Sequence, residues 1–237
     1  KDFTADEENL VNDFAALGLR TLVFASRDLE NSELDDWLNK YREAEASLQN
    51  RDELVFQCAA QVEDELHYIG ISGVEDRLQS EVPQTIEWIR KAGIKLWVLT
   101  GDKLETAVAI GKTSGVITPT SEMLIVSTTY ENEIEKKLDV LLDNLQNGPD
   151  QFENPVLIMT AASLELAMTN FMDKFVKLAE QCHSVILCRV SPFMKAHVTQ
   201  IVKENIEKAQ TLAVGDGAND VGMIQVADIG IGIYGRE

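Results

Sequence analysis

The chain has 237 residues, of which 45% are hydrophobic and 26% are charged, values that suit a globular protein with a sizeable core. Its formal net charge of −19 argues against binding to nucleic acid or to an anionic membrane surface, because both require a basic face. No run approaches the roughly 20 apolar residues that a membrane-spanning helix needs. The first residue is Lys1 rather than methionine, so we expect a segment of a longer protein.

The three cysteines, Cys58, Cys182 and Cys188, do not have the spacing of metal ligands. Cys182 and Cys188 flank an apolar run, which predicts that both thiols lie in the core. An odd number of cysteines without a secretory signal favours a reducing compartment.

Residues 1–66 predict a partial domain. The expected elements are a helix that a capping box begins at residue 4 and Gly18 ends, a strand over residues 20–26, and helices over 32–48 and 52–66. One strand is too few for a complete sheet, so this section should depend on material outside it. Its net charge is −11, against −8 for residues 67–237, and this asymmetry indicates two domains with a boundary at 66/67.

From residue 67 onward the pattern changes to a regular alternation of strands and helices. Strands are expected over residues 68–72, 94–99, 123–127, 156–159, 185–187, 212–214 and 229–233, and helices over 81–92, 103–114, 130–147, 163–180 and 191–205. Such alternation with apolar strands is typical of a parallel sheet with helices on both faces. We therefore predict an α/β fold of the Rossmann-like type for residues 67–237.

A short polar loop follows the apolar run of residues 94–99. It consists of Thr100, Gly101 and Asp102, and a helical pattern begins directly after it. A threonine hydroxyl together with free backbone N–H groups at a helix N-terminus can bind an anion, and the glycine permits close approach of a ligand. Asp102 could instead serve largely as a helix cap.

Two further loops carry chemistry at predicted strand ends. After residues 185–187, Ser191 and Pro192 begin a helix, and Lys195 lies one turn inside it, where its ammonium can reach a phosphate. After residues 212–214, a glycine-flanked loop contains Asp216 and Asp220, and paired carboxylates suit Mg²⁺. A solvated acidic turn is the alternative for this last loop taken alone.

The same three segments closely resemble P-type ATPases of the haloacid dehalogenase-like superfamily. The matches are Leu-Thr-Gly-Asp-Lys at residues 99–103, Cys-Arg-Val-Ser-Pro at 188–192, and Gly-Asp-Gly-Ala-Asn-Asp at 215–220. Within this family they resemble the lipid-flippase (type IV) class, and residues 18–22 and 74–79 fit the same pattern. The resemblance therefore covers almost the whole chain.

The resemblance implies roles at the phosphoryl group. Thr100 and Gly101 would hold the transferred phosphoryl group, and Lys195 would neutralise the charge that develops on its oxygens. Asp102 would line the nucleotide pocket. Thr100 and Lys195 would thus act in catalysis as well as in binding.

The resemblance also implies metal and nucleotide contacts. Asp216 and Asp220 would hold Mg²⁺, with Asn219 and Asp220 positioning the metal, the phosphate and the nucleophile. Arg20 would contact the phosphates of ATP, and Arg189 would line the same pocket. As isolated residues, Arg20 could be only a solvated or salt-bridged arginine, and Arg189 could be purely structural.

The chain departs from the family in one important place. The family nucleophile lies in an Asp-Lys-Thr-Gly-Thr stretch, which these 237 residues do not contain. In the family it precedes an inserted nucleotide-binding domain, whose last part resembles residues 1–66. We therefore expect residues 67–237 to be a phosphorylation domain without the strand that carries the nucleophile, and the isolated chain to be inactive.

The resemblance implies the ATP-hydrolysing part of a phospholipid-transporting ATPase, on the cytosolic face of a membrane and part of an integral membrane protein. Its cofactors would be Mg²⁺ and ATP. A phospholipid would bind in membrane segments outside this chain, with a possible accessory membrane subunit and no nucleic acid.

Two alternatives stay open. Smaller departures at Ala109, Val226 and residues 160–162 would also fit a degenerate regulatory module, such as the flippase-like half of protist guanylate cyclases. A stand-alone phosphatase of the superfamily would need an Asp-x-Asp motif before Thr100, and none occurs.

Overall fold

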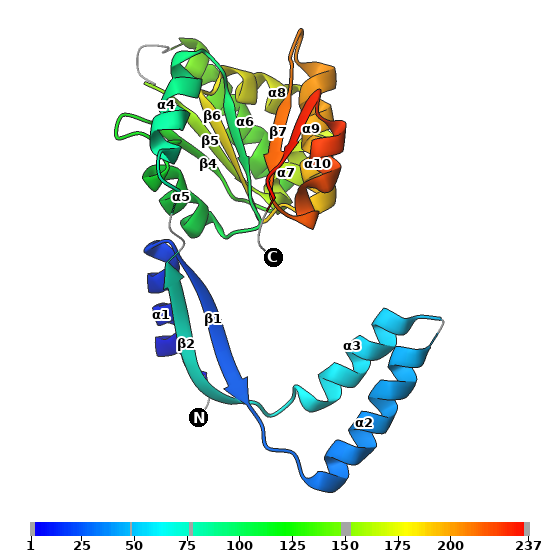
Figure 1. The fold of residues 1–237 in the computed structure, drawn as a ribbon. Coiled ribbons are helices and arrows are strands. Elements are labelled where there is room, and N and C mark those ends of the chain that lie inside the picture. The colour runs from blue at the N-terminus through cyan, green and yellow to red at the C-terminus, as the bar shows by residue number, and fades with distance from the viewer. Residues whose placement is uncertain (1–2, 48, 76–77, 148–152, 235–237) are drawn as a thin grey trace. The chain divides into compact units, whose positions relative to one another are not determined.

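The computed structural model describes residues 3–47, 49–75, 78–147 and 153–234 (Figure 1). Contacts divide the chain into two compact units, Lys1–Asp76 and Arg77–Glu237. The division lies ten residues after the boundary that we expected, because the strand following residue 66 pairs within the first unit.

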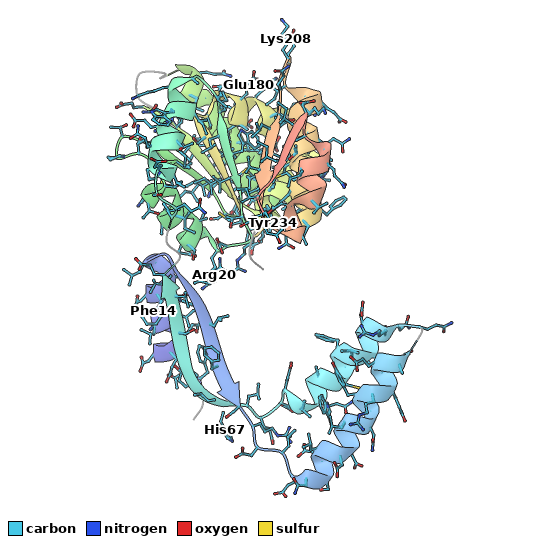
Figure 2. The ribbon with its side chains drawn as sticks, in the orientation of Figure 1. Phe14, Arg20, His67, Glu180, Lys208 and Tyr234 are labelled. Carbon is cyan, nitrogen blue, oxygen red and sulfur yellow. The ribbon has the colours of Figure 1, made fainter. Side chains whose placement is uncertain are left out.

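The first unit contains an antiparallel hairpin covered by one helix. The hairpin consists of β1 (Leu19–Ser26) and β2 (His67–Glu75), paired from Leu19 with Glu75 to Ser26 with His67, and α1 (Ala5–Ala16) packs against it. A Cβ on Gly73 of β2 would lie 3.1 Å from the ring of Phe14 on α1 (Figure 2). We expected residues 68–72 to open the parallel sheet, and this was wrong. Apolar alternation identifies a strand but does not identify its partner.

Between the two strands the chain forms a pair of helices. They are α2 (Asn31–Ala46) and α3 (Arg51–Val62), which pack against each other. The indole N–H of Trp37 donates to the backbone oxygen of Cys58 at 2.7 Å, and the Trp37 ring stacks on Tyr41. The predicted helices are thus confirmed, although α3 ends four residues earlier than expected.

The second unit contains the predicted parallel sheet. Its four strands, in spatial order, are β3 (Leu96–Leu99), β6 (Ser184–Cys188), β5 (Val156–Thr160) and β4 (Met123–Val126). Two more strands, β7 (Leu212–Gly215) and β8 (Ile229–Gly232), form a separate parallel pair. Within the described residues β3 pairs only with β6 and β7 only with β8, so each keeps one edge without a neighbouring strand.

Helices cover both faces of the four-stranded sheet (Figure 1). The helices are α4 (Val82–Lys91), α5 (Leu104–Thr113), α6 (Glu131–Asn147), α7 (Ala161–Asn170), α8 (Met172–Gln181) and α9 (Pro192–Asn205). A further helix, α10 (Val221–Val226), packs against α9, β7 and β8. Alternate residues of one strand enter opposite cores: Val185 and Leu187 of β6 pack with α6 to α9, whereas Ile186 packs with α4 and α5. The predicted α/β fold is therefore confirmed.

One helix of the second unit differs from expectation. The single helix expected over residues 163–180 is divided into α7 and α8 at Phe171, whose φ of −138° and ψ of 35° are not helical. The break turns the chain so that Leu164 and Phe175 are both fully buried. Cys182 and Cys188 are buried free thiols, as predicted, and burial raises the pKa of Cys182 to about 12.

No helix in the described part of the chain combines the length and the apolar composition that crossing a membrane requires.

Candidate functional site

The loops that follow β3 and β6 are joined by backbone hydrogen bonds. The N–H of Thr100 donates to the oxygen of Leu187, and the N–H of Val190 donates to the oxygen of Thr100, both at 3.0 Å. The N–H of Arg189 donates to the oxygen of Asp102, also at 3.0 Å. Arg189 has a φ of 57°, in the left-handed region that non-glycine residues seldom adopt. These bonds hold the two loops together at the carboxyl ends of their strands.

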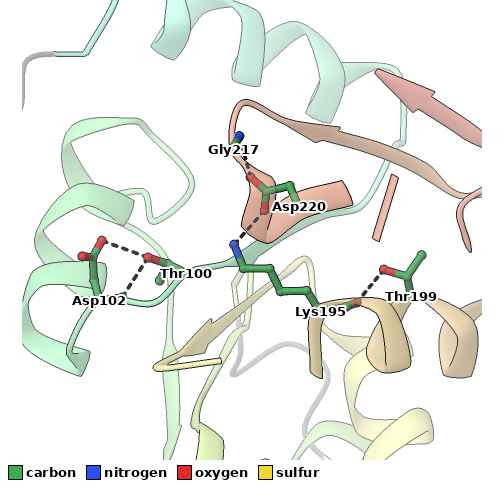
Figure 3. Close-up of polar contacts among 6 residues, drawn as sticks. All are labelled: Thr100, Asp102, Lys195, Thr199, Gly217 and Asp220. Carbon is green, nitrogen blue, oxygen red and sulfur yellow. Dashed lines mark hydrogen bonds and ion pairs between the residues drawn. The ribbon is translucent and has the colours of Figure 1, made fainter. Parts of the chain in front are cut away.

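Lys195 reaches the site from the first turn of α9. The side chain of Ser191 caps this helix by accepting from the N–H of Met194 at 3.3 Å, and Pro192 occupies the first turn. The Lys195 side chain is buried, and its Nζ lies 2.8 Å from Oδ1 of Asp220 (Figure 3). Only 11% of either side chain is exposed. The ammonium is therefore held in one place before any ligand arrives.

Asp220 is positioned by the loop that follows β7. It ends the short helix η2 (Ala218–Asp220), and its Oδ2 accepts from the N–H of Gly217 at 3.4 Å. Burial raises the pKa of Asp220, but the hydrogen bond and charge of Lys195, with backbone N–H groups of Gly217 and Asp216, outweigh burial and leave the pKa below its usual value. Asp220 is thus an ionised partner for the lysine.

Gly215 is needed for this arrangement. A Cβ at residue 215 would lie 2.2 Å from the Cβ of Asp220, closer than any real contact. Sequence reasoning quoted Gly215 as part of the acidic loop without giving it a role. Its position at the end of a predicted strand, directly before Asp216, could have indicated this role, because glycine is favoured where the backbone passes close to a side chain.

Thr100 and Asp102 form a local pair on the other side of Lys195 (Figure 3). The Thr100 hydroxyl donates to Oδ2 of Asp102 at 2.9 Å and accepts from the N–H of Asp102 at 3.1 Å. Lys103, not Asp102, is the N-cap residue of α5, and it makes no side-chain cap bond. The helix-cap alternative for Asp102 is therefore wrong. No atom lies within 4 Å of the point that a Cβ on Gly101 would occupy, so this side of the loop is open to a ligand.

The remaining predicted residues do not belong to these two side-chain pairs. Asp216 and Asn219 are exposed on the loop after β7, and the Arg189 side chain is exposed after β6. Arg20 lies on β1 in the first unit, so its contact with ATP stays a prediction.

The acidic loop supplies at most a pair of metal-binding carboxylates. Among the described residues, no group of three or more His, Cys, Asp and Glu side chains could hold a metal ion. Asp216 is exposed, and Asp220 lies four residues farther along the same loop. One or two carboxylates with phosphate oxygens and water are nevertheless what Mg²⁺ commonly uses, so the oxygen donors fit this ion.

Comparison with protein families identifies the fold. A family model described as haloacid dehalogenase-like hydrolase matches residues 4–143, which is more than half of the chain. The chain belongs to the haloacid dehalogenase-like hydrolases. A second model with the same description matches residues 78–234 of this hydrolase, which include all three loops of the site.

The curated relatives of this haloacid dehalogenase-like chain confirm the predicted resemblance. It is 41% identical to Phospholipid-transporting ATPase VA of Homo sapiens over 264 residues, which cover 100% of the chain and 18% of the relative. It is 40% identical to the human ATPase VD over 248 residues, covering 96% and 17%. It is 38% identical to Phospholipid-transporting ATPase 2 of Arabidopsis thaliana over 229 residues, covering 96% and 20%. The chain therefore spans about a fifth or less of the length of these relatives.

Proposed function

We propose that these residues form the ATP-hydrolysing part of a phospholipid-transporting P-type ATPase, on the cytosolic face of a membrane. In this proposal, Mg-ATP-dependent formation of an aspartyl-phosphate drives lipid translocation through membrane segments outside the chain. The buried pair of Lys195 and Asp220 beside the Thr100 loop carries the proposal. The names of the relatives support the choice of ATP and phospholipid as substrates.

The site suits transfer of a phosphoryl group because its lysine is fixed in advance. Thr100 and Gly101 would bind the phosphoryl oxygens, and the Lys195 ammonium would offset the negative charge that grows on them. Since the hydrogen bond to Asp220 already orients Lys195, little reorganisation is needed when the phosphoryl group arrives. Asp102 and Arg189 would line the nucleotide pocket, and Arg20 would contact the phosphates of ATP from the nucleotide-binding domain.

The acidic loop is proposed to hold Mg²⁺. Asp216 and Asp220 would supply the carboxylate oxygens, and Asn219 would help to position the phosphate. The ion would lower the negative charge that the phosphate oxygens present to an attacking carboxylate.

The nucleophile is proposed to come from a strand outside these 237 residues. β3 and β7 each have an edge without a neighbour among the described residues. All four residues of β3 are apolar and half-buried, although an edge strand usually has a polar side. A parallel strand placed against these edges would bring its carboxyl end, with an aspartate, toward Thr100 and Lys195. The first unit would then be the end of a nucleotide-binding domain and the second a phosphorylation domain.

An accessory membrane subunit is part of the proposal only by resemblance to the family. No observation favours the alternatives of a degenerate regulatory module or a stand-alone phosphatase.

The test compares two lengths of the protein. With labelled ATP and Mg²⁺, residues 1–237 alone should incorporate no ³²P, because phosphoryl transfer of this kind needs a covalent carboxylate nucleophile. Extending the protein upstream to include the Asp-Lys-Thr-Gly-Thr strand should restore labelling, and replacing that aspartate with asparagine should abolish it. Rapid Mg²⁺-dependent hydrolysis by residues 1–237 alone would instead support a phosphatase, and an unlabelled extended protein would support a degenerate module.

A further inference from the structure

The Thr100 hydroxyl is bound twice by a single neighbouring residue. It donates its proton to the Asp102 carboxylate at 2.9 Å and accepts from the backbone N–H of the same residue at 3.1 Å (Figure 3). A hydroxyl has one proton to donate. In this arrangement Thr100 can offer a ligand only a lone pair. Phosphate oxygens are also acceptors, so the hydroxyl as held here does not bind them.

The backbone of Thr100 offers no substitute. Its N–H donates to the oxygen of Leu187 at 3.0 Å, and its oxygen accepts from Val190 at 3.0 Å. The hydroxyl is therefore the one donor through which Thr100 can contact a phosphoryl group. The backbone N–H of Arg189 donates to the backbone oxygen of Asp102 and holds this residue close to Thr100. The Asp102 carboxylate therefore competes with any ligand for the hydroxyl proton of Thr100.

We infer that Asp102 is a positioning residue that withholds the Thr100 hydroxyl from phosphate. The inference rests on the proposed function, in which a phosphoryl group is the ligand of Thr100. Binding then requires the hydroxyl to turn from the carboxylate to a phosphoryl oxygen, and the affinity is reduced by the lost hydrogen bond. A hydrogen bond to a charged group corresponds to about a tenfold difference in affinity or more. Inorganic phosphate is consequently held weakly.

The experiment measures inorganic phosphate binding to the 237-residue chain with Mg²⁺, following the amide signals of residues 100–102 by NMR. Asp102→Ala should tighten binding about tenfold, because the hydroxyl proton becomes available. Asp102→Asn keeps an oxygen acceptor for the hydroxyl while removing the charge, so it should tighten binding by only about threefold. Thr100→Val, which lacks the hydroxyl, is the control. When Asp102→Ala is added to Thr100→Val, phosphate affinity should change by no more than about threefold, through loss of charge alone.

A merely structural Asp102 gives a different result. If Asp102 only shapes the loop or lines a nucleotide pocket, Asp102→Ala should weaken phosphate binding or tighten it by no more than about threefold through loss of charge, and that result would overturn the inference. Equal tightening by Asp102→Ala in the parent chain and in the Thr100→Val background would also overturn it, because the effect would then be charge alone.

Urea unfolding of the parent, Asp102→Ala, Thr100→Val and the double variant separates failure of the inference from failure of the proposed function. The hydrogen bond predicts that the double variant loses less stability than the two single variants added together. The stability losses could be non-additive, as the hydrogen bond predicts, while none of the proteins binds phosphate. That combination would refute both the proposed phosphate site and the role of Asp102 in it. If the proteins bind phosphate with an affinity that does not depend on Asp102, only the positioning role is refuted.

Discussion

Replacing Lys195 with alanine tests stability and chemistry together. The change removes the ammonium 2.8 Å from Asp220 and leaves a carboxylate of which 11% is exposed without its partner. Removing one member of a buried ion pair costs about 3–5 kcal/mol, because the remaining charge is uncompensated. We expect about 3 kcal/mol, the lower end, since the exposed residues 216–219 keep solvent near this carboxylate.

In the proposed function, loss of the lysine also removes one electrostatic stabiliser of the transferring phosphoryl group. The rate of phosphoenzyme formation should fall by roughly 10²–10⁴, which corresponds to a few kcal/mol. The first assay is urea unfolding of residues 1–237, and the second is ³²P labelling of the full-length parent from labelled ATP. Lys177→Ala is the matched control, because Lys177 is exposed on α8 and has no ion pair within the part of the chain that the structure describes.

A second change separates the two effects. In Lys195→Ala the added replacement Asp220→Asn removes the uncompensated charge, so most of the lost stability should return while labelling stays low. Lowering the pH should also reduce the difference in stability between Lys195→Ala and the parent. With lysine present the pKa of Asp220 is lowered, and its stabilising contribution is lost as pH falls through that pKa. Without lysine, only the backbone N–H groups of Gly217 and Asp216 oppose the effect of burial, so the pKa of Asp220 should be higher than in the parent and the stability deficit of the variant should shrink as the pH is lowered.

Two results would refute this reasoning. One is equal loss of labelling in Lys195→Ala and Lys177→Ala, which would mean that the effect does not depend on the position of Lys195 beside Asp220. The other is a Lys195→Ala protein as stable as the parent at neutral pH, which would mean that Asp220 is not buried as an ion.

Three further predictions concern the acidic loop and the strands beside it. Asp216→Asn in the full-length parent should abolish phosphoenzyme formation, because too little oxygen charge would remain to bind Mg²⁺ against its hydration shell; wild-type labelling would contradict the metal assignment. Gly215→Ala should destabilise residues 1–237 by about 1–3 kcal/mol in urea, since its Cβ would overlap Asp220, whereas Gly232→Ala, with nothing within 4 Å, should have little effect. The Asp228 carboxylate accepts from Lys203 and Thr211, which lowers its pKa to about 2; its stabilising contribution should disappear as pH falls from about 4 to about 2, and unfolding midpoints of Asp228→Asn should show no such loss.

The sequence by itself determined the elements of the second unit and the place of its polar loops. Apolar runs with period two and period 3.6 are local properties, so strands β3 to β8 and the helical segments from α4 to α9 could be recognised without knowing their partners, apart from the break between α7 and α8. Strict alternation then required parallel strands, whose carboxyl ends must share one edge. That argument was sufficient to predict that Thr100, Lys195 and Asp220 belong to one site.

Only the tertiary structure decided which groups touch. It pairs residues 67–75 with β1 rather than with the parallel sheet, and it joins Lys195 to Asp220 and Thr100 to Asp102. Strand pairing and side-chain partners depend on contacts between residues far apart in the chain, or on rotamers chosen by packing, and neither leaves a periodic signal in the sequence. The carboxylates of Asp220 and Asp102 could therefore be recognised beforehand as candidate site residues, but their hydrogen-bond partners could not.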